Sequence, residues 1–239
     1  MASPLSGKRV VIIGGASGIG LAVAQAALDE GAKVVVASSQ PANVEAARRR
    51  LGEGAEGLKV DVKDEADVAG FFEAVGTFDH LVYTAGDWNA PRGVALAELD
   101  LTAAQAAFTV RFWGALAAVK HGAARIAEGG SITLTDGMLA HRPMRGAAVS
   151  TAMLGAIEHL TRALAVELAP LRVNAVCPGW VMTERNRQAP EALVKRYTGA
   201  LPLARGAEPD EAAQAYLYLM RGGYTTGQVM LVDGGGSLV

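Results

Sequence analysis

The chain has 239 residues, of which 51% are hydrophobic and 19% are charged, and its formal net charge is -2. This apolar fraction excludes an intrinsically disordered protein. The 22 basic and 24 acidic residues are nearly balanced, so the chain lacks the excess of basic residues that is typical of nucleic-acid-binding proteins. We therefore predict a single folded domain over residues 1–239, with no nucleic-acid partner.

The number of cysteines and the lengths of the apolar runs indicate in which cellular compartment the protein is expected. Cys177 is the one cysteine, so it cannot form an internal disulfide, which favours a reducing environment. Residues 1–8 lack the apolar stretch of a signal peptide, and no run approaches the roughly 18 apolar residues of a membrane helix. The histidines are scattered without metal-ligand spacing. We expect a soluble cytoplasmic protein with no membrane contact and no metal site.

In chain order, short β-branched runs alternate with Ala-rich stretches of high helix propensity. The predicted strands are Arg9–Ile13, Lys33–Ala37, Leu58–Val60, His80–Tyr83, Ser131–Thr135, Arg172–Val176 and Gln228–Val232. The predicted helices are Ile19–Glu30, Asn43–Leu51, Glu65–Val75, Ala103–Ala127, Ala147–Ala169 and Pro209–Arg221. This alternation predicts an α/β fold, a Rossmann-type doubly wound, mostly parallel sheet with helices on both faces.

The least regular region, Gly179 to Ala207, contains two prolines and a short helical stretch near Glu191–Tyr197. An insertion at this place, just before the last helix, is suited to cover a ligand. A plain surface excursion is an equally good interpretation.

A glycine-rich turn follows the first predicted strand, in Ile13-Gly14-Gly15-Ala16-Ser17-Gly18-Ile19-Gly20. Glycines permit a tight turn and close backbone approach to a pyrophosphate, and the following helix presents free N–H groups. We predict a dinucleotide site that includes Gly14, Ser17, Gly18, Ile19 and Gly20. The alternative is a turn required only for packing the helix on the sheet.

Further motifs occur in a fixed order after this turn: Asp61-Val62, Ala85-Gly86, Pro178-Gly179 with Thr183, and Val232-Asp233-Gly234-Gly235. Together with the Gly-x-x-x-Gly-x-Gly spacing, they resemble the short-chain dehydrogenase/reductase family over nearly the whole chain. The resemblance implies that Asp61 and Val62 contact the adenine, that Ala85 and Gly86 follow the fourth strand at the cofactor, and that Pro178, Gly179 and Thr183 hold the nicotinamide end.

The turn after the second strand bears on the choice of nicotinamide cofactor. An acidic residue there would accept hydrogen bonds from the ribose of NAD and repel a 2′-phosphate, but this chain has Ser38-Ser39-Gln40. The lack of an acid favours NADP, although no Arg or Lys stands in this turn and NAD remains possible. Alternatively, these residues cap the next helix.

The catalytic positions of the family are all replaced. Its Tyr-x-x-x-Lys pair aligns with Val149 and Met153, its Ser with Asp136 and its Asn with Arg111. Valine and methionine side chains cannot exchange protons. General acid–base help is worth about 10²–10⁴-fold in rate, so the usual alcohol/carbonyl chemistry is predicted to be lost or severely impaired.

Asp136, His141 and Arg111 are the candidate replacements, because an Asp–His pair can move protons and a guanidinium can bind an anion or a carbonyl oxygen. The alternative is that Arg111 pairs with Asp136 in a buried salt bridge that fills the emptied pocket. The predicted function is an atypical NADP(H)-binding oxidoreductase acting on an unknown small carbonyl or alcohol compound. A catalytically silent dinucleotide-binding sensor or partner is the second candidate. The resemblance also implies a homotetramer or homodimer.

Overall fold

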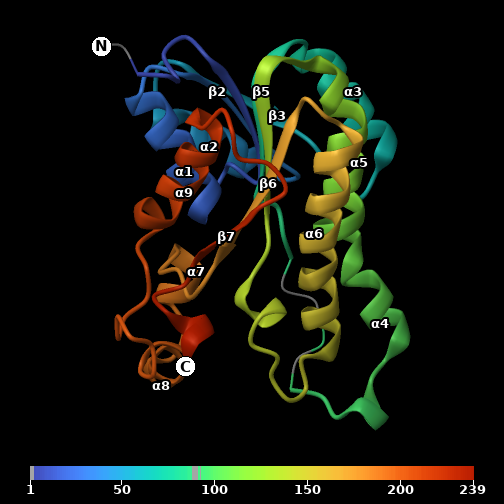
Figure 1. Cartoon of the computed structure of the whole chain (residues 1–239), viewed down its shortest axis with the longest axis vertical. Helices are drawn as coiled ribbons and strands as arrows, with labels where there is room; N and C mark the ends of the chain where they lie inside the picture. Colours follow the sequence, from blue (N-terminus) through green and yellow to red (C-terminus); the bar gives the residue numbers. More distant parts are fainter. Residues whose placement is uncertain (1–2, 88–90, 92) are drawn as a thin grey trace.

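The computed structural model describes residues 3–87, 91 and 93–239. In this part of the chain, seven strands form one parallel sheet in the order β3-β2-β1-β4-β5-β6-β7 (Figure 1). The strands are β1 (Arg9–Ile13), β2 (Lys33–Ser38), β3 (Ala55–Lys59), β4 (Phe78–Tyr83), β5 (Ile126–Thr135), β6 (Arg172–Pro178) and β7 (Val229–Val232). The predicted α/β class and doubly wound sheet are confirmed.

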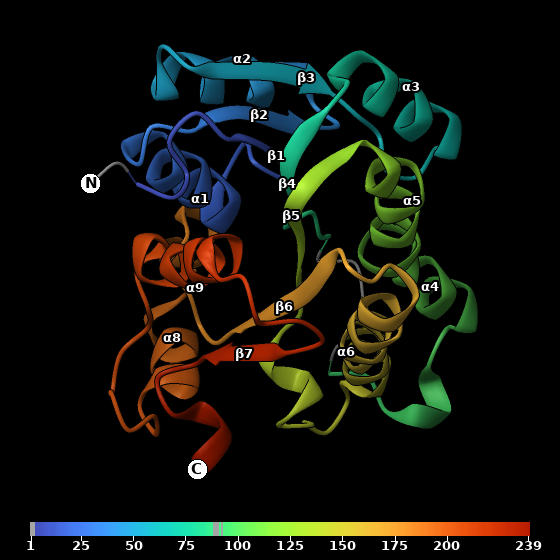
Figure 2. The ribbon, with the colours of Figure 1, turned by 45° about the horizontal axis from the view of Figure 1, so that its top comes forward.

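Helices cover both faces of this sheet (Figure 2). They are α1 (Gly18–Asp29), α2 (Pro41–Leu51), α3 (Glu65–Val75), α4 (Leu101–Ala106), α5 (Gly114–Gly122), α6 (Ala148–Glu167), α7 (Glu184–Arg187), α8 (Glu191–Thr198) and α9 (Pro209–Arg221). The first, second and ninth helices lie on one face, and the third, fifth and sixth lie on the other. None of the described helices combines the length and apolarity needed to cross a lipid bilayer.

The central strands are apolar in both directions because both of their faces are covered. In β1, Val11 and Ile13 belong to the core under α3, α5 and α6. Val10 and Ile12 belong to the core under α1, α2 and α9. Alternate side chains of a strand point to opposite faces, so a continuous run of Val and Ile is what a doubly covered sheet requires.

The strand order reverses direction at β1, which has β2 on one side and β4 on the other. Connections from β1 and β4 therefore leave towards opposite halves of the sheet, and a crevice opens beyond the carboxyl ends of these strands. In open α/β sheets this switch point is where ligands bind.

Two element predictions need correction. The predicted helix Ala103–Ala127 is interrupted by a π-helical turn over Thr109–Trp113 and ends before β5, which begins at Ile126 because it pairs with Phe78 of β4. The third strand runs over Ala55–Lys59 rather than Leu58–Val60, in register with β2. In both cases strand pairing between distant segments sets the boundary, which local propensity does not report.

Candidate active site

A cavity of about 1060 Å³ opens beyond the carboxyl ends of the strands. Its size is at the upper end of ordinary ligand sites. Every residue predicted to bind the cofactor lines it: Gly14, Ser17, Gly18, Ile19, Gly20, Ser38, Ser39, Asp61, Val62, Ala85, Gly86, Pro178, Gly179 and Thr183. The tertiary structure thus gathers the separate motifs onto one continuous wall, and the same wall includes Arg111 and Asp136.

The glycine turn between β1 and α1 is shaped for close backbone approach. Gly14 has φ +91°, and a Cβ there would lie 2.5 Å from the amide nitrogen of Ala85. A Cβ on Gly20 would lie 2.3 Å from the carbonyl oxygen of Gly14. The Ser17 side chain makes no capping hydrogen bond to α1, which leaves the first turn of this helix open to an acceptor from a ligand. These features fit a dinucleotide pyrophosphate.

Ser38 and Ser39 line the cavity where β2 ends. The alternative that this turn caps α2 is met only in part: Gln40 is the N-cap residue, but no side chain makes a capping hydrogen bond there. Lys63 lines the same cavity from the turn after β3, the strand paired with β2. The sequence analysis sought a cation only after the second strand and therefore missed this one, which is suited to attract a phosphate.

Val149 and Met153, which the sequence aligns with the family's Tyr and Lys, cannot donate a proton. Met153 is buried and lines the cavity. Val149, one turn earlier in α6, is half-buried and is absent from the cavity wall. The Tyr-x-x-x-Lys machinery therefore has no structural substitute at its own positions.

Arg111 lies in the π-helical turn Thr109–Trp113, a kind of turn that often marks functional sites. A Cβ on Gly86 would fall 2.5 Å from the guanidinium carbon of Arg111, so this glycine lets the guanidinium lie flat against the backbone that follows β4. The predicted salt bridge between Arg111 and Asp136 is wrong. Neither carboxyl oxygen of Asp136 has a hydrogen-bond partner of defined geometry among the described residues.

Asp136 is the first residue after β5, and its amide nitrogen donates to the carbonyl oxygen of Val176 in β6 at 2.9 Å. Only 2% of the residue is exposed. Burial first, and the neighbouring Glu158 carboxyl second, raise the pKa of Asp136 to about 8. A carboxyl that keeps its proton at neutral pH, on the wall of the cavity, is equipped to act as a general acid.

Glu158, like Lys63, was not predicted from the sequence. It lies on the buried face of α6, with Leu154 one turn before it and Thr161 one turn after it. His141 does not line the cavity but turns to this carboxyl, with Nε2 2.7 Å from Oε1 of Glu158. A glutamate in the apolar stripe of an amphipathic helix was the available signal, because buried carboxyl groups are rare unless they have a partner.

Three tyrosines lie near the site: two are buried and hydrogen-bonded, and the third forms part of the cavity wall. Tyr83 and Tyr216 are buried, and their hydroxyl groups bond to the carbonyl oxygen of Val110 and to Oγ1 of Thr135, respectively. Burial raises the pKa of both phenols. Tyr197 of α8 lines the cavity and stacks on Trp180 with ring centroids 4.6 Å apart, so this pair forms an aromatic part of the wall.

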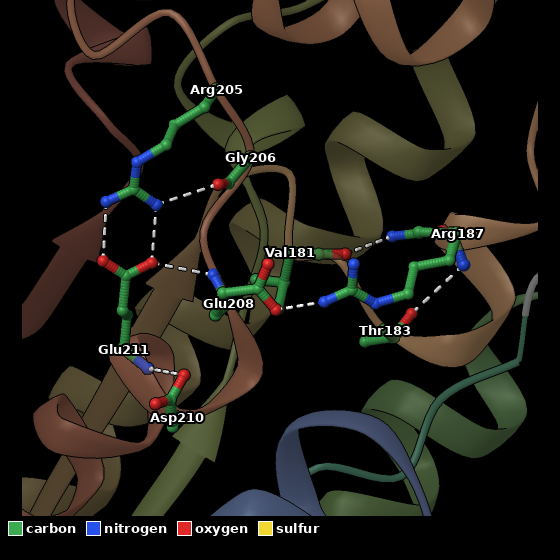
Figure 3. A network of polar contacts seen from close by, with 9 residues as sticks. Val181, Thr183, Arg187, Arg205, Gly206, Glu208, Asp210 and Glu211 are labelled. Carbon is green, nitrogen blue, oxygen red and sulfur yellow. Dashed lines mark hydrogen bonds and ion pairs between the residues drawn. The ribbon is translucent and has the colours of Figure 1, made fainter. Parts of the chain in front are cut away.

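The predicted insertion from Gly179 to Ala207 forms one side of the cavity through α7 and α8. Its two ends are tied together by a parallel bridge between Val181 and Ala207. Figure 3 shows the ion pairs that fix it to the start of α9: Arg187 contacts Glu208, and Arg205 makes a two-pronged contact of 2.6 and 2.7 Å with Glu211. The insertion is therefore an anchored wall of the site.

Comparisons with known proteins agree with this geometry. The family model described as enoyl-(acyl carrier protein) reductase matches residues 14–237. The short-chain dehydrogenase/reductase ATR9 of Stachybotrys chlorohalonatus is 38% identical over 253 residues, covering 98% of both chains.

Solved structures give the same result. A small-chain dehydrogenase crystallised in complex with NADPH is 39% identical with a TM-score of 0.84, over 98% of this chain and 100% of that one. The MalC reductase/Diels-Alderase of Malbranchea aurantiaca is 31% identical with a TM-score of 0.90, over 99% of this chain and 98% of that one. On its motifs, its fold and these matches, the chain belongs to the short-chain dehydrogenase/reductase family.

Proposed function

We propose that this protein is an NADP(H)-dependent oxidoreductase that reduces a small carbonyl compound with Asp136 as the proton donor. One observation carries the proposal: a buried carboxyl with a raised pKa lines the same cavity as the complete set of cofactor motifs. The NADPH complex known for a relative of 39% identity supports the choice of cofactor.

Different residues of the cavity would bind the cofactor, donate the proton and orient the substrate. The glycine turn, with Gly14 and Gly20, would hold the pyrophosphate, and Ser38 with Lys63 would receive the 2′-phosphate. The bound dinucleotide supplies the hydride. Asp136 gives its proton to the oxygen of the substrate and becomes a carboxylate, and the product is an alcohol. Arg111, against Gly86 on the same wall, would orient the carbonyl oxygen or an anionic group of the substrate.

A silent dinucleotide-binding protein is the second candidate, and the apolar Met153 on the cavity wall favours it. Such a protein would bind NADPH without turnover and act as a sensor or as a partner of an active relative. A homo-oligomer is proposed in either case, formed through α4, the π-helical turn before α5, and α6. In these elements Leu101, Trp113 and Val166 are exposed by 69%, 58% and 81%.

The first test is a fluorescence titration of the purified protein with NADPH and NADH. Micromolar binding with a preference for NADPH is the expected result, and binding of neither nucleotide would overturn both candidates. The second test screens wild-type protein for NADPH oxidation with a panel of ketones and aldehydes. Turnover that Asp136→Asn abolishes supports the reductase.

Restoring the family's pair by Val149→Tyr with Met153→Lys separates the two candidates. If only the double variant reduces generic ketones, the wild-type protein is a silent binder on an intact scaffold. If the wild-type protein already turns over a substrate and the double variant loses this activity, the site has its own chemistry.

A further inference from the structure

A second carboxyl lies behind the proposed acid, away from the cavity wall. Asp136 and Glu158 are both buried, exposed by 2% and 8%, and they come from different elements, the end of β5 and the middle of α6. Both carboxyl groups adjoin His141: a carboxyl oxygen of Asp136 lies within 4.8 Å of a ring nitrogen of His141, and Oε1 of Glu158 lies 2.7 Å from Nε2. The Glu158 carboxyl also contributes to the raised pKa of Asp136. Two carboxylates have no hydrogen to donate, so a bond between them exists only when one of them is protonated.

The surroundings decide which carboxyl holds that proton. Glu158 contacts two basic side chains, with Nε2 of His141 at 2.7 Å and Nη2 of Arg162 at 3.2 Å. Among the described residues, no basic side chain forms an ion pair with Asp136. The single proton is therefore placed on Asp136, whose pKa is raised by burial and by the Glu158 carboxyl.

The other polar groups around the pair do not compete for this role. Sγ of Cys177 in β6 faces Asp136, but burial raises the pKa of this thiol, so it stays protonated. Asp233 after β7 also acts on Cys177, and it is itself held by the backbone amides of Gly235 and Ser237. His141 connects the pair to solvent, because 28% of its side chain is exposed.

We propose that Glu158 is a positioning residue that shares one proton with Asp136, and that Glu158 and His141 form the route by which this proton is replaced from solvent. This inference rests on the proposed function for the direction of transfer. After Asp136 has protonated the substrate oxygen, neither carboxyl group holds a proton. A protonated His141 gives its proton to Glu158, and Glu158 passes it on to Asp136. The neutral imidazole takes a new proton from solvent, so each turnover consumes one solvent proton and leaves Glu158 and His141 as they began.

A bound divalent cation is the competing use of the same groups. Asp136, His141 and Cys177 each offer one donor atom, and these atoms lie within 4.8 Å of one another. The neutral thiol is a poor ligand because metals bind the thiolate, so the cluster is better suited to a proton. Elemental analysis of the purified protein tests this point: one equivalent of a tightly held cation would overturn the shared proton.

The main test needs no substrate. Infrared difference spectra of the nucleotide-free protein detect the carbonyl stretch of a protonated carboxyl. We expect one such band at neutral pH, and it should be absent in Asp136→Asn. In Glu158→Gln the band should titrate at a pH about one unit or more below that of the wild type, because the amide can donate to Asp136 and lower its pKa. Glu167→Gln is the matched control, since it makes the same change on the exposed end of the same helix. The proposal would be contradicted if the wild-type protein lacked this carbonyl band, or if the band of Glu158→Gln titrated at the same pH as that of the wild type.

A second variant leaves the buried pair in place. His141→Gln should keep the infrared band but slow the replacement of the proton, so that kcat falls, KM stays constant and the solvent deuterium isotope effect on kcat rises. An unchanged kcat and isotope effect would rule out the route through His141. If no carbonyl compound is reduced by the wild-type protein, the proposed function fails while the infrared experiment still decides whether the proton is shared.

Discussion

The backbone amide of Asp136 donates to the carbonyl oxygen of Val176 at 2.9 Å, so this residue is fixed beside the end of β6. Pro178 is the last residue of β6 and Gly179 follows it, and both line the same cavity as Asp136. The proposed acid is thus held by the sheet itself and not by a mobile loop. Groups placed by the backbone of a scaffold keep their position when neighbouring side chains change.

Replacing the acid should separate chemistry from binding. In Asp136→Asn the side chain keeps its shape but has no acidic proton, so turnover should fall about 10²–10⁴-fold, the usual contribution of general acid catalysis. The Kd for NADPH should change little, because the cofactor motifs are untouched. Steady-state kinetics and fluorescence titration measure the two quantities. A variant with full kcat would refute Asp136 as the donor.

The raised pKa of Asp136 should also appear in the pH dependence of stability. The folded protein binds this proton more tightly than the unfolded chain, with a pKa of about 8 against 3.8. The stability it contributes is fully present below about pH 4 and is lost as the pH rises through 8. Denaturant unfolding should therefore show a decline from about pH 5 to 8 that is absent in Asp136→Asn.

His80 provides an internal control, because its contribution to stability changes with pH in the opposite direction to that of Asp136. Burial lowers the pKa of this side chain from 6.5 to about 4, so its contribution is present above pH 6.5 and is lost as the pH falls through 4. Below pH 6.5 the two contributions oppose each other, so His80→Gln should steepen the decline there and leave the decline from pH 6.5 to 8 in place. A His80→Gln profile that changes above pH 6.5 would show that the assignment to individual groups is wrong.

The glycine turn should tolerate no side chain. A Cβ on Gly20 meets the backbone oxygen of Gly14 at 2.3 Å, so Gly20→Ala must displace the phosphate turn and abolish NADPH binding. Gly70→Ala is the matched control, because a Cβ there meets nothing within 4 Å in the middle of α3. The control should bind NADPH normally and gain about 0.5–1 kcal/mol of stability, since alanine favours a helix over glycine. Both are read by titration and by thermal unfolding.

The anchor of the insertion should affect local opening more than global stability. Hydrogen bonds from Arg205 and from the amide of Glu208 lower the pKa of Glu211 to about 2, so this contact is ionic throughout the neutral range. Glu211→Gln should increase hydrogen–deuterium exchange across residues 182–206, while Tm changes little because exposed ion pairs contribute little to folding. Glu53→Gln, another exposed position, is the control. Exchange equal to wild type would mean that the wall is held by other contacts.

Oligomer formation should depend on the exposed indole of Trp113. This side chain is 58% exposed next to the π-helical turn, where a large apolar group gains from a covered surface. Trp113→Glu should lower the mass measured by light scattering and leave the far-ultraviolet spectrum unchanged. A wild-type protein that is already monomeric would contradict the proposed interface.

Much of this protein is determined locally. The bounds of β1, α3 and α9 agree with the predicted elements, because period-two apolar runs and strong helix formers act within single segments. The glycine turn and the Pro178-Gly179 segment were likewise readable in the sequence, since their backbone requirements are met by the residues themselves. So was the replacement of the catalytic pair by Val149 and Met153, which is a matter of residue identity.

The tertiary structure decided the rest. It buried Asp136 without the salt bridge to Arg111 that the sequence offered as an alternative, and the Glu158 carboxyl of α6 contributes to the raised pKa of Asp136. It ended the predicted helix Ala103–Ala127 early through strand pairing at Ile126, and it brought Lys63 to the wall that Ser38 lines. These features depend on which distant segments meet. Burial and the charges of non-local neighbours then set the proton affinity of each group.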